Sequence, residues 1–404
     1  MTLRSLQALC LTSFFIADVR DGLGPFLGIF LTQHHWQPDD IGLLMTAGGM
    51  AGLLATLPAG FITDASQNKR LMLALLCVII TGSTLLLWFS QGNGVVALSQ
   101  IVSGICAAFV GPLITGITLG LTGQNGFSAQ MGKNEAFNHA GNFATALIAG
   151  GIAWRWGIGG IFILMACTML LTLVALLAIR RGDIDNQAAR GLELTDTPQI
   201  PDFSVLTKNT ALLITGLTLL LFHLANAALL PMLSMRIASA PGAINPGLYA
   251  AATVIISQAV MIPVAIWTAG RIDKYGYWRL IMLALLIMPV RAALAASTAA
   301  PLMMVPVQIL DGLAAGVLGV VVPSFIVALL RGSGHVNAGQ SVVMLMQGAG
   351  AAMSPALTGM IAGHYSFAAA FSVLSVIALA ALIIWWRNAP TLCASIVTPT
   401  RSYD

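Results

Sequence analysis

The chain has 404 residues, of which 58% are hydrophobic and only 8% are charged. A soluble domain carries about a quarter charged residues, so this composition excludes an ordinary soluble protein and indicates a polytopic membrane protein. The net charge of +4 comes from basic residues scattered among short loops, and the five cysteines form no CxxC pair. Neither nucleic-acid binding nor a zinc site or disulfide framework is therefore expected.

Long apolar windows between short polar loops predict an all-α membrane protein with about twelve transmembrane helices. The predicted spans are 6–32, 40–63, 71–90, 95–122, 135–153, 158–179, 209–235, 246–270, 279–299, 302–330, 338–362 and 367–387. The longest polar stretch lies between the sixth and seventh spans. It divides the chain into an N-terminal six-helix bundle, 1–180, a linker, 181–208, a C-terminal six-helix bundle, 209–390, and a tail, 391–404.

Basic residues set the predicted orientation, because Lys and Arg stay on the cytoplasmic side of a membrane. If successive spans cross the membrane in opposite directions, the basic loop residues lie almost entirely on one side of the membrane. Only Arg155 and Arg236 lie on the other side. Both termini, the linker and the tail are therefore expected in the cytoplasm, with the protein in the inner membrane of a bacterium.

Three charged residues interrupt the first span. Asp18, Arg20 and Asp21 lie in an otherwise apolar stretch, 6–31, and an ionisable side chain at the centre of a membrane helix costs roughly 2.5 to 3.5 kcal/mol. Asp18 and Asp21 share a helix stripe, whereas Arg20 lies about 160° away from Asp18. Because two carboxylates on one stripe cannot both ionise cheaply, both are proton-coupling candidates. Arg20 is either a substrate-binding residue or a structural partner in a buried ion pair.

A break is expected directly after these charges. Gly22, Gly24 and Pro25 follow at once, and together they predict a bent or loosened helix. Broken helices mark the binding sites of many transporters, so this part of the first span is a candidate wall of a substrate cavity.

Polar residues recur in the fifth and seventh spans. Asn138 and Asn142 are substrate-binding candidates near the start of the fifth span, and His223 and Asn226 share a stripe of the seventh, ahead of Pro231. His223 could titrate near physiological pH, but a lone intramembrane histidine is at least as often a hydrogen-bonded packing residue.

The ninth and tenth spans contribute three more candidates. Asp311 is the third proton-coupling candidate, and Gln308, one turn before it, and Arg291 are substrate-binding candidates. The alternative for Asp311 is an interhelical pair with Arg291, and Arg291 could instead extend toward the membrane surface.

The loops after the second and eighth spans carry related motifs. The first contains Gly60, Asp64, Lys69 and Arg70, and the second contains Gly270, Asp273, Lys274 and Arg279. An acid at a helix end with bases one turn away can form charge-assisted contacts that bias two packing states. The simpler alternative is a solvated loop whose positive charge fixes the topology.

The two halves also match each other in sequence at an offset of 208 residues, that is 308 minus 100. The matching pairs are Gln100 with Gln308, Gly104 with Gly312, Ala107 with Ala315, Gly111 with Gly319, and Gly126 with Gly334. Duplicated six-span halves are one of the repeat plans of secondary transporters.

With these loop motifs the chain resembles the major facilitator superfamily of secondary transporters over essentially its whole length. The resemblance implies two pseudo-symmetric six-helix bundles, and it implies a gating role for the two loop motifs, with Asp64 and Asp273 forming a cytoplasmic latch. The chain departs from the family pattern at Ala65 and Gln67 of the first loop. Drug-efflux members carry an arginine in the fourth span, where this chain has Gln100, so a standard drug/proton antiporter is disfavoured.

The leading functional prediction is a monomeric, proton-coupled secondary active transporter that moves a small organic solute by alternating access, with import and export both open. The phosphate-binding Gly-x-x-x-x-Gly-Lys-Ser/Thr pattern is absent, and no enzymatic activity or cofactor is expected. A copper-like metal transporter is the first alternative, motivated by His223, Met232, Met235 and a total of 18 methionines. A non-transporting membrane sensor is the alternative of another class.

Overall fold

The computed structural model describes residues 3–21, 23, 26–36, 38–192, 204–238, 246–297 and 300–397. Across these ranges the chain is almost entirely helical and contains no strand, which confirms the predicted all-α class. Nine helices of the described part are long and apolar enough to cross a membrane. The protein is therefore a multi-pass membrane protein.

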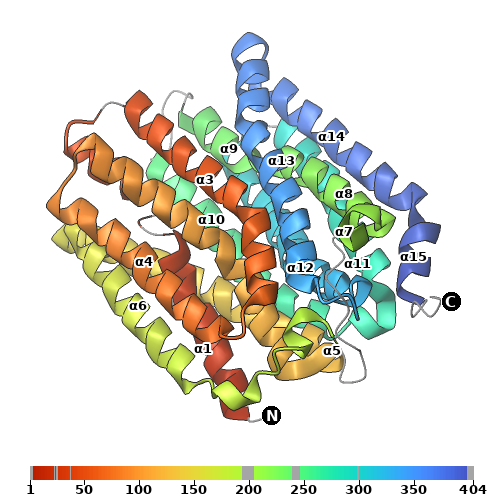
Figure 1. The fold of residues 1–404 in the computed structure, drawn as a ribbon. Coiled ribbons are helices and arrows are strands. Elements are labelled where there is room, and N and C mark those ends of the chain that lie inside the picture. Colours follow the sequence, from red (N-terminus) through yellow and green to blue (C-terminus); the bar gives the residue numbers. More distant parts are fainter. Residues whose placement is uncertain are drawn as a thin grey trace. The chain divides into compact units, whose positions relative to one another are not determined.

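The helices are coloured in chain order in Figure 1. Those of the N-terminal half are α1 Leu3–Asp21, α2 Phe26–Gln33, α3 Pro38–Ala65, α4 Lys69–Phe89, α5 Asn93–Trp156 and α6 Gly159–Ala178, followed by the 3-10 turns Arg181–Asp183 and Ala188–Arg190. Those of the C-terminal half are α7 Ser204–Lys208, α8 Thr210–Asn226, α9 Leu229–Ala238, α10 Pro246–Ala269, α11 Ile272–Ser297, the 3-10 turn Pro301–Met303, α12 Met304–Leu329, α13 Val336–His364, α14 Phe367–Arg387 and α15 Ala389–Val397.

One of the nine long helices contains two of the predicted spans. Helix α5 has 64 residues, which at 1.5 Å per residue is about three times the length that a bilayer core requires. Gly123 interrupts it with a φ of 63° and ψ of −175°. Only glycine adopts this conformation at little cost, so Gly123 divides α5 where the sequence predicts the loop between the fourth and fifth spans.

The chain separates into two compact units. The first unit consists of residues 1–196 together with 334–341, and the second consists of residues 197–333 and 342–404. In the first unit α5 packs against α1, α3 and α4, and in the second α12 packs against α10 and α11. Each unit therefore has its own core, and the segment 334–341, which contains the start of α13, belongs to the first unit.

The internal repeat is visible in the helix boundaries. Helices α3 and α10 begin at Pro38 and Pro246 (246 − 38 = 208), and helices α6 and α14 begin at Gly159 and Phe367 (367 − 159 = 208). The ends of α5 and α13, Trp156 and His364, differ by the same 208 residues (364 − 156). The offset found in the sequence thus also relates the secondary structure of the two halves.

Matching glycines make the same kind of helix contact in each unit. A side chain at Gly104 of α5 would collide with the backbone of Gly48 in α3. At Gly312 of α12, a Cβ atom would lie 2.6 Å from Cβ of Val260 and 2.7 Å from the carbonyl oxygen of Ser257, both in α10. Glycine lets the two backbones approach closely, as at other helix interfaces in membranes.

The break predicted in the first span falls between two helices, although Gly22, Gly24 and Pro25 themselves lie outside the described residues, and the seventh span contains a break that was not predicted. Helix α1 ends at Asp21 and α2 begins at Phe26, while α8 ends at Asn226 and α9 begins at Leu229. Polar residues and a helix break therefore occur together in both halves.

Candidate functional site

The charged cluster of the first span lies at the end of α1. The Oδ2 atom of Asp18 accepts a hydrogen bond of 2.5 Å from the hydroxyl of Thr168 in α6. Thr168 is buried, so Asp18 is held inside the helix bundle of the first unit. Asp21 is the last residue of α1, and its side chain lies outside the described residues.

Arg20 lines a cavity of about 450 Å³ in the first unit. The walls come from α1, α2, α3, α4 and α5, and Arg20 is the one charged residue among the described residues that line it. The hydroxyls of Thr56, Thr84 and Ser103 and the amide of Gln100 add polar groups. Arg20 also interacts electrostatically with Glu135 of α5, which does not line the cavity.

The polar residues of the fifth span form local contacts along α5. Asn142 donates a hydrogen bond of 3.1 Å to the side-chain oxygen of Asn138, and both residues are partly buried. Nε2 of His139 lies 3.8 Å from a carboxylate oxygen of Glu135. The structure therefore brings Asn138 and Asn142 together with each other, and neither lines the cavity described above.

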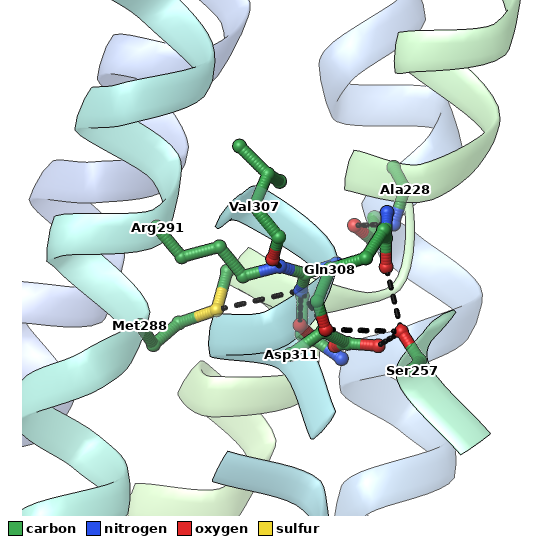
Figure 2. Close-up of polar contacts among 9 residues, drawn as sticks. Ala228, Ser257, Met288, Arg291, Val307, Gln308 and Asp311 are labelled. Carbon is green, nitrogen blue, oxygen red and sulfur yellow. Dashed lines mark hydrogen bonds and ion pairs between the residues drawn. The ribbon is translucent and has the colours of Figure 1, made fainter. Parts of the chain in front are cut away.

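A second group of candidates meets in the second unit (Figure 2). Arg291 of α11 is 1% exposed and forms an ion pair of 2.8 Å with Oδ1 of Asp311 in α12. The same guanidinium group donates hydrogen bonds to the side-chain oxygen of Asn226 and to the carbonyl oxygen of Val307. Of the alternatives that the sequence leaves open, the structure shows the pair and places Arg291 in the interior.

Ser257 of α10 completes this cluster from the other side of Asp311 (Figure 2). Its hydroxyl lies 2.9 Å from Oδ2 of Asp311 and 2.8 Å from Oε1 of Gln308. Gln308 is fully buried, and its Nε2 atom has no hydrogen-bond partner among the described residues. The polar cluster therefore joins α8, α10, α11 and α12, and the single O–H of Ser257 donates to either Asp311 or Gln308 at one time.

His223 lies one turn before Asn226 in α8 and interacts electrostatically with Asp311. It is partly buried, whereas Met235 of α9 is 52% exposed. The described residues contain no group of three His, Cys, Asp or Glu side chains that could hold a metal ion. The copper-like alternative therefore gains no support from the arrangement of these residues.

The loop motif of the first half caps a helix within the first unit. Asp64, at the end of α3, is buried, and its carboxylate accepts hydrogen bonds from the backbone N–H groups of Asn337 and Ala338 at 3.2 and 2.8 Å. The side-chain amide of Asn337 donates a further bond of 2.7 Å. An acid that binds the free N–H groups at a helix start also complements the helix dipole. Asp64 thus caps α13.

Gly60 of this motif supports the same contact, whereas Lys69 and Arg70 bind backbone carbonyl oxygens elsewhere in the first unit. A Cβ atom at Gly60 would lie 2.5 Å from the hydroxyl of Ser341 and 2.7 Å from Cα of Ala338, so the segment 334–341 can approach α3 only where glycine is present. Lys69 is buried and donates to the carbonyl oxygen of Ser66 at 2.7 Å, and Arg70 donates to the carbonyl oxygen of Ile179 at the end of α6.

The loop motif of the second half is arranged differently. Gly270, Asp273, Lys274 and Arg279 are all exposed. Gly276 within this motif has a φ of 75° and interrupts the start of α11. The two loops therefore share a sequence pattern, while a buried, helix-capping acid is found only in the first of them.

Two polar groups were not among the sequence-based candidates. Ser257 closes the Asp311 cluster, and a buried network in the first unit joins Gln130 and Asn134 of α5 to Thr118 and Cys10, with the amide of Asn134 2.9 Å from the Thr118 hydroxyl. Ser257 occupies the position that Gly49 has in the other half (257 − 49 = 208). The repeat offset therefore gives no signal for a polar group there, and Ser257 is identified by its contact with Asp311 alone.

The sequence profile of the Major Facilitator Superfamily matches residues 9–290, which is more than half of the chain. The chain belongs to this superfamily. Its membership agrees with the repeat, the loop motifs and the nine long apolar helices, and it identifies this superfamily member as a transporter rather than an enzyme.

Two curated relatives of this superfamily member come from Mycobacterium tuberculosis, strains CDC 1551 / Oshkosh and H37Rv, and both are described as uncharacterised MFS-type transporters. Each is 33% identical over 386 residues, which cover 95% of this chain and 92% of the relative. The likeness therefore extends over both halves.

Solved structures of the superfamily have the same fold at low sequence identity. The human organic anion transporter MFSD10 (TETRAN) matches with a TM-score of 0.72 at 15% identity, covering 95% of this chain and 99% of that one. The transporter FucP in its outward conformation matches with a TM-score of 0.77 at 11% identity, covering 96% and 99%. These similarities establish the fold alone.

Proposed function

We propose that this transporter moves a small organic solute across the bacterial cytoplasmic membrane by alternating access and couples that movement to protons. The observation that carries the proposal is Asp18, a carboxylate held by Thr168 inside the first unit, immediately before the break between α1 and α2. An ionisable group inside a membrane helix is expensive and therefore points to a functional pathway. Asp21, at the helix end, is the second proton-coupling candidate.

Asp311 is the third proton-coupling candidate. Its carboxylate binds Arg291, Ser257 and, through electrostatic interaction, His223. Protonation of Asp311 would weaken the pair with Arg291 and so change the packing of α11 against α12, which is the kind of local charge event that biases a two-state element. The substrate-binding candidates of this unit belong to the same cluster as Asp311. We propose that they respond to the binding of substrate or to the protonation of Asp311. These residues are Arg291, Asn226, Gln308 and His223.

The substrate side of the proposal rests on the first unit. Arg20 faces a cavity of about 450 Å³, which lies within the range of roughly 300 to 1,000 Å³ typical of small-molecule sites. Asn138 and Asn142 are proposed as additional polar contacts along α5. Asp64 and the loop that contains it are proposed to gate transport by binding and releasing the segment 334–341, with Asp273 and its loop as the second gating element.

The test is proton movement in proteoliposomes that contain a pH-sensitive dye. A panel of small organic acids, amides and amines is added, and the pH change is compared between wild type, Asp18→Asn, Asp21→Asn and Asp311→Asn. We expect at least one panel member to move protons with the wild type and at least one variant to lose that movement while keeping its thermal unfolding temperature. If all three folded variants move protons as the wild type does, proton coupling through these carboxylates is wrong.

The proposal also includes orientation and assembly. The distribution of basic residues supports cytoplasmic termini, and the complete repeat within one chain supports a monomer, since the two homologous halves that a transporter of this kind needs are already present.

A further inference from the structure

The two halves differ sharply at one pair of equivalent positions. In the second unit, Arg291 and Asp311 form a buried ion pair of 2.8 Å between α11 and α12. At the repeat offset, the equivalent residues of the first unit are Ser83 (291 − 208) and Ser103 (311 − 208). These two serines also touch, with their hydroxyl oxygens 3.0 Å apart. The contact is thus retained in both units, but only the second unit has charges there.

The cavity of the first unit lies at this place. Ser103 and Gln100 line it, and they correspond to Asp311 and Gln308 of the second unit, where both side chains are tied to Ser257. Ser257 in turn corresponds to Gly49, which also lines the cavity. Asp311 and Ser257 of the second unit are therefore replaced by the smaller Ser103 and Gly49 in the first unit, and both of these smaller residues border the open space.

The charge that lines the cavity points to the kind of ligand, although the same Arg20 also interacts with Glu135 outside the cavity. The second unit supplies both the cation and the carboxylate of its pair. The cavity is lined by one cation, Arg20, and by no acid among the described residues. Guanidinium binds a carboxylate through two parallel hydrogen bonds, and it does so most strongly where water is excluded. An anion in the cavity would then supply the carboxylate that Ser103 lacks.

We propose that this cavity is a binding site for the carboxylate group of a compact organic anion, held by Arg20 and Gln100. This inference rests on the proposed function and gives the class of its substrate. Gln100 has no hydrogen-bond partner among the described residues, so its amide is free to donate to the ligand. Leu23, Leu27 and Met45 provide an apolar wall for the rest of the molecule.

Gly49 offers a direct way to block the site without disturbing the helix packing. A Cβ atom added at Gly49 meets nothing within 4 Å, whereas one at Gly48 would lie 2.8 Å from the carbonyl oxygen of Gln100. A larger side chain at position 49 can therefore enter the cavity. Gly42 lies on the same helix, also meets nothing within 4 Å, and does not line the cavity, which makes it the matched control.

The experiment measures ligand binding to the full-length protein in detergent by thermal unfolding and by calorimetry. The probes are benzoate, benzamide and benzylamine, which share a ring and differ in charge, together with lactate as a smaller carboxylate. We expect a carboxylate to raise the unfolding temperature of the wild type, while the amide and the amine do not. Arg20→Gln, Gly49→Leu and the double variant Ser83→Arg with Ser103→Asp should each weaken carboxylate binding about tenfold or more, and Gly42→Leu should bind as the wild type does.

Two results would overturn the inference. One is wild-type protein that binds neither carboxylate, and the other is a folded Gly49→Leu variant that binds as tightly as the wild type.

Proton movement in proteoliposomes distinguishes a failure of this inference from a failure of the proposed function. If benzylamine or benzamide moves protons while the carboxylates neither bind nor move them, the substrate class is wrong and proton-coupled transport stands. If a carboxylate binds but no probe moves protons, the binding site stands and proton coupling fails.

Discussion

Arg291 shows how one buried cation can be accommodated in an apolar bundle. Its guanidinium group is 1% exposed and has an acid, an amide oxygen and a carbonyl oxygen as acceptors. Desolvating a charge costs several kcal/mol, and the attraction of a good pair can only offset that cost. The pair with Asp311 is therefore expected to fix which residues pack together, without adding much net stability.

A double-mutant cycle tests this expectation. Arg291→Met should lower the free energy of unfolding by about 3 to 5 kcal/mol, because it leaves the carboxylate of Asp311 buried and uncompensated. Arg291→Met combined with Asp311→Leu should recover most of that loss, since the apolar pair has no charge to bury. Unfolding in mixed detergent micelles provides the measurement. Ser83→Ala, at the equivalent place of the first unit, is the control and should cost less than about 1.5 kcal/mol. A double variant no more stable than Arg291→Met would contradict the argument.

At the scale of helices, the decisive contact is the one between α3 and the start of α13. It combines a buried acid, Asp64, with the free N–H groups of Asn337 and Ala338, and it depends on the missing side chain of Gly60. A cap of this kind contributes about 0.5 to 2 kcal/mol, which is small enough to be broken during a transport cycle. The contact between α3 and the start of α13 is therefore weak enough to form and break once in each transport cycle.

Gly60→Ala and Asp64→Asn should both weaken this contact. Alanine at position 60 forces the segment 334–341 away from α3, and asparagine at position 64 removes the negative charge from the helix start. We expect either change to reduce the transport rate at least about tenfold while the protein stays folded, and to increase proteolytic cleavage within 334–341. Gly82→Ala is the matched control, because its Cβ atom meets nothing within 4 Å. Unchanged transport by both variants would remove the gating role of Asp64.

At the scale of the whole molecule, orientation in the membrane follows from the basic residues and can be tested through one cysteine. Cys393 is exposed on α15, near the end of the described chain, and Cys167 is exposed on the apolar helix α6. A charged maleimide that does not cross membranes should label Cys393 in inside-out vesicles and leave it unlabelled in intact spheroplasts. It should not reach Cys167 within the bilayer. Cys393→Ser is the control, and labelling of Cys393 in spheroplasts would place the C-terminus on the other side.

The sequence predicted the helical class, the repeat, the helix break of the first span and the family because these depend on hydropathy, glycine and proline, which act locally. It left the pairing of Arg291 open, since one sequence position cannot show whether a long side chain turns inward or outward. It also could not distinguish Gly48 from Gly49. Both belong to one run of small residues, but Gly48 contacts the backbone of α5 and Gly49 borders the cavity. Which side of a helix faces a partner depends on the packing of the complete bundle.

The constant spacing of the helix boundaries has a consequence for the turns between them. Helix α4 ends at Phe89 and α5 begins at Asn93, and 208 residues later α11 ends at Ser297 and the next turn begins at Pro301 (297 − 89 = 208 and 301 − 93 = 208). Surface connections normally accept insertions more readily than helices do. Here the two copies have kept the same number of residues in the turn after α4 and in the turn after α5. Turn length is thus retained at these two places, and we expect one residue inserted into either turn to be tolerated less readily than surface connections normally tolerate it.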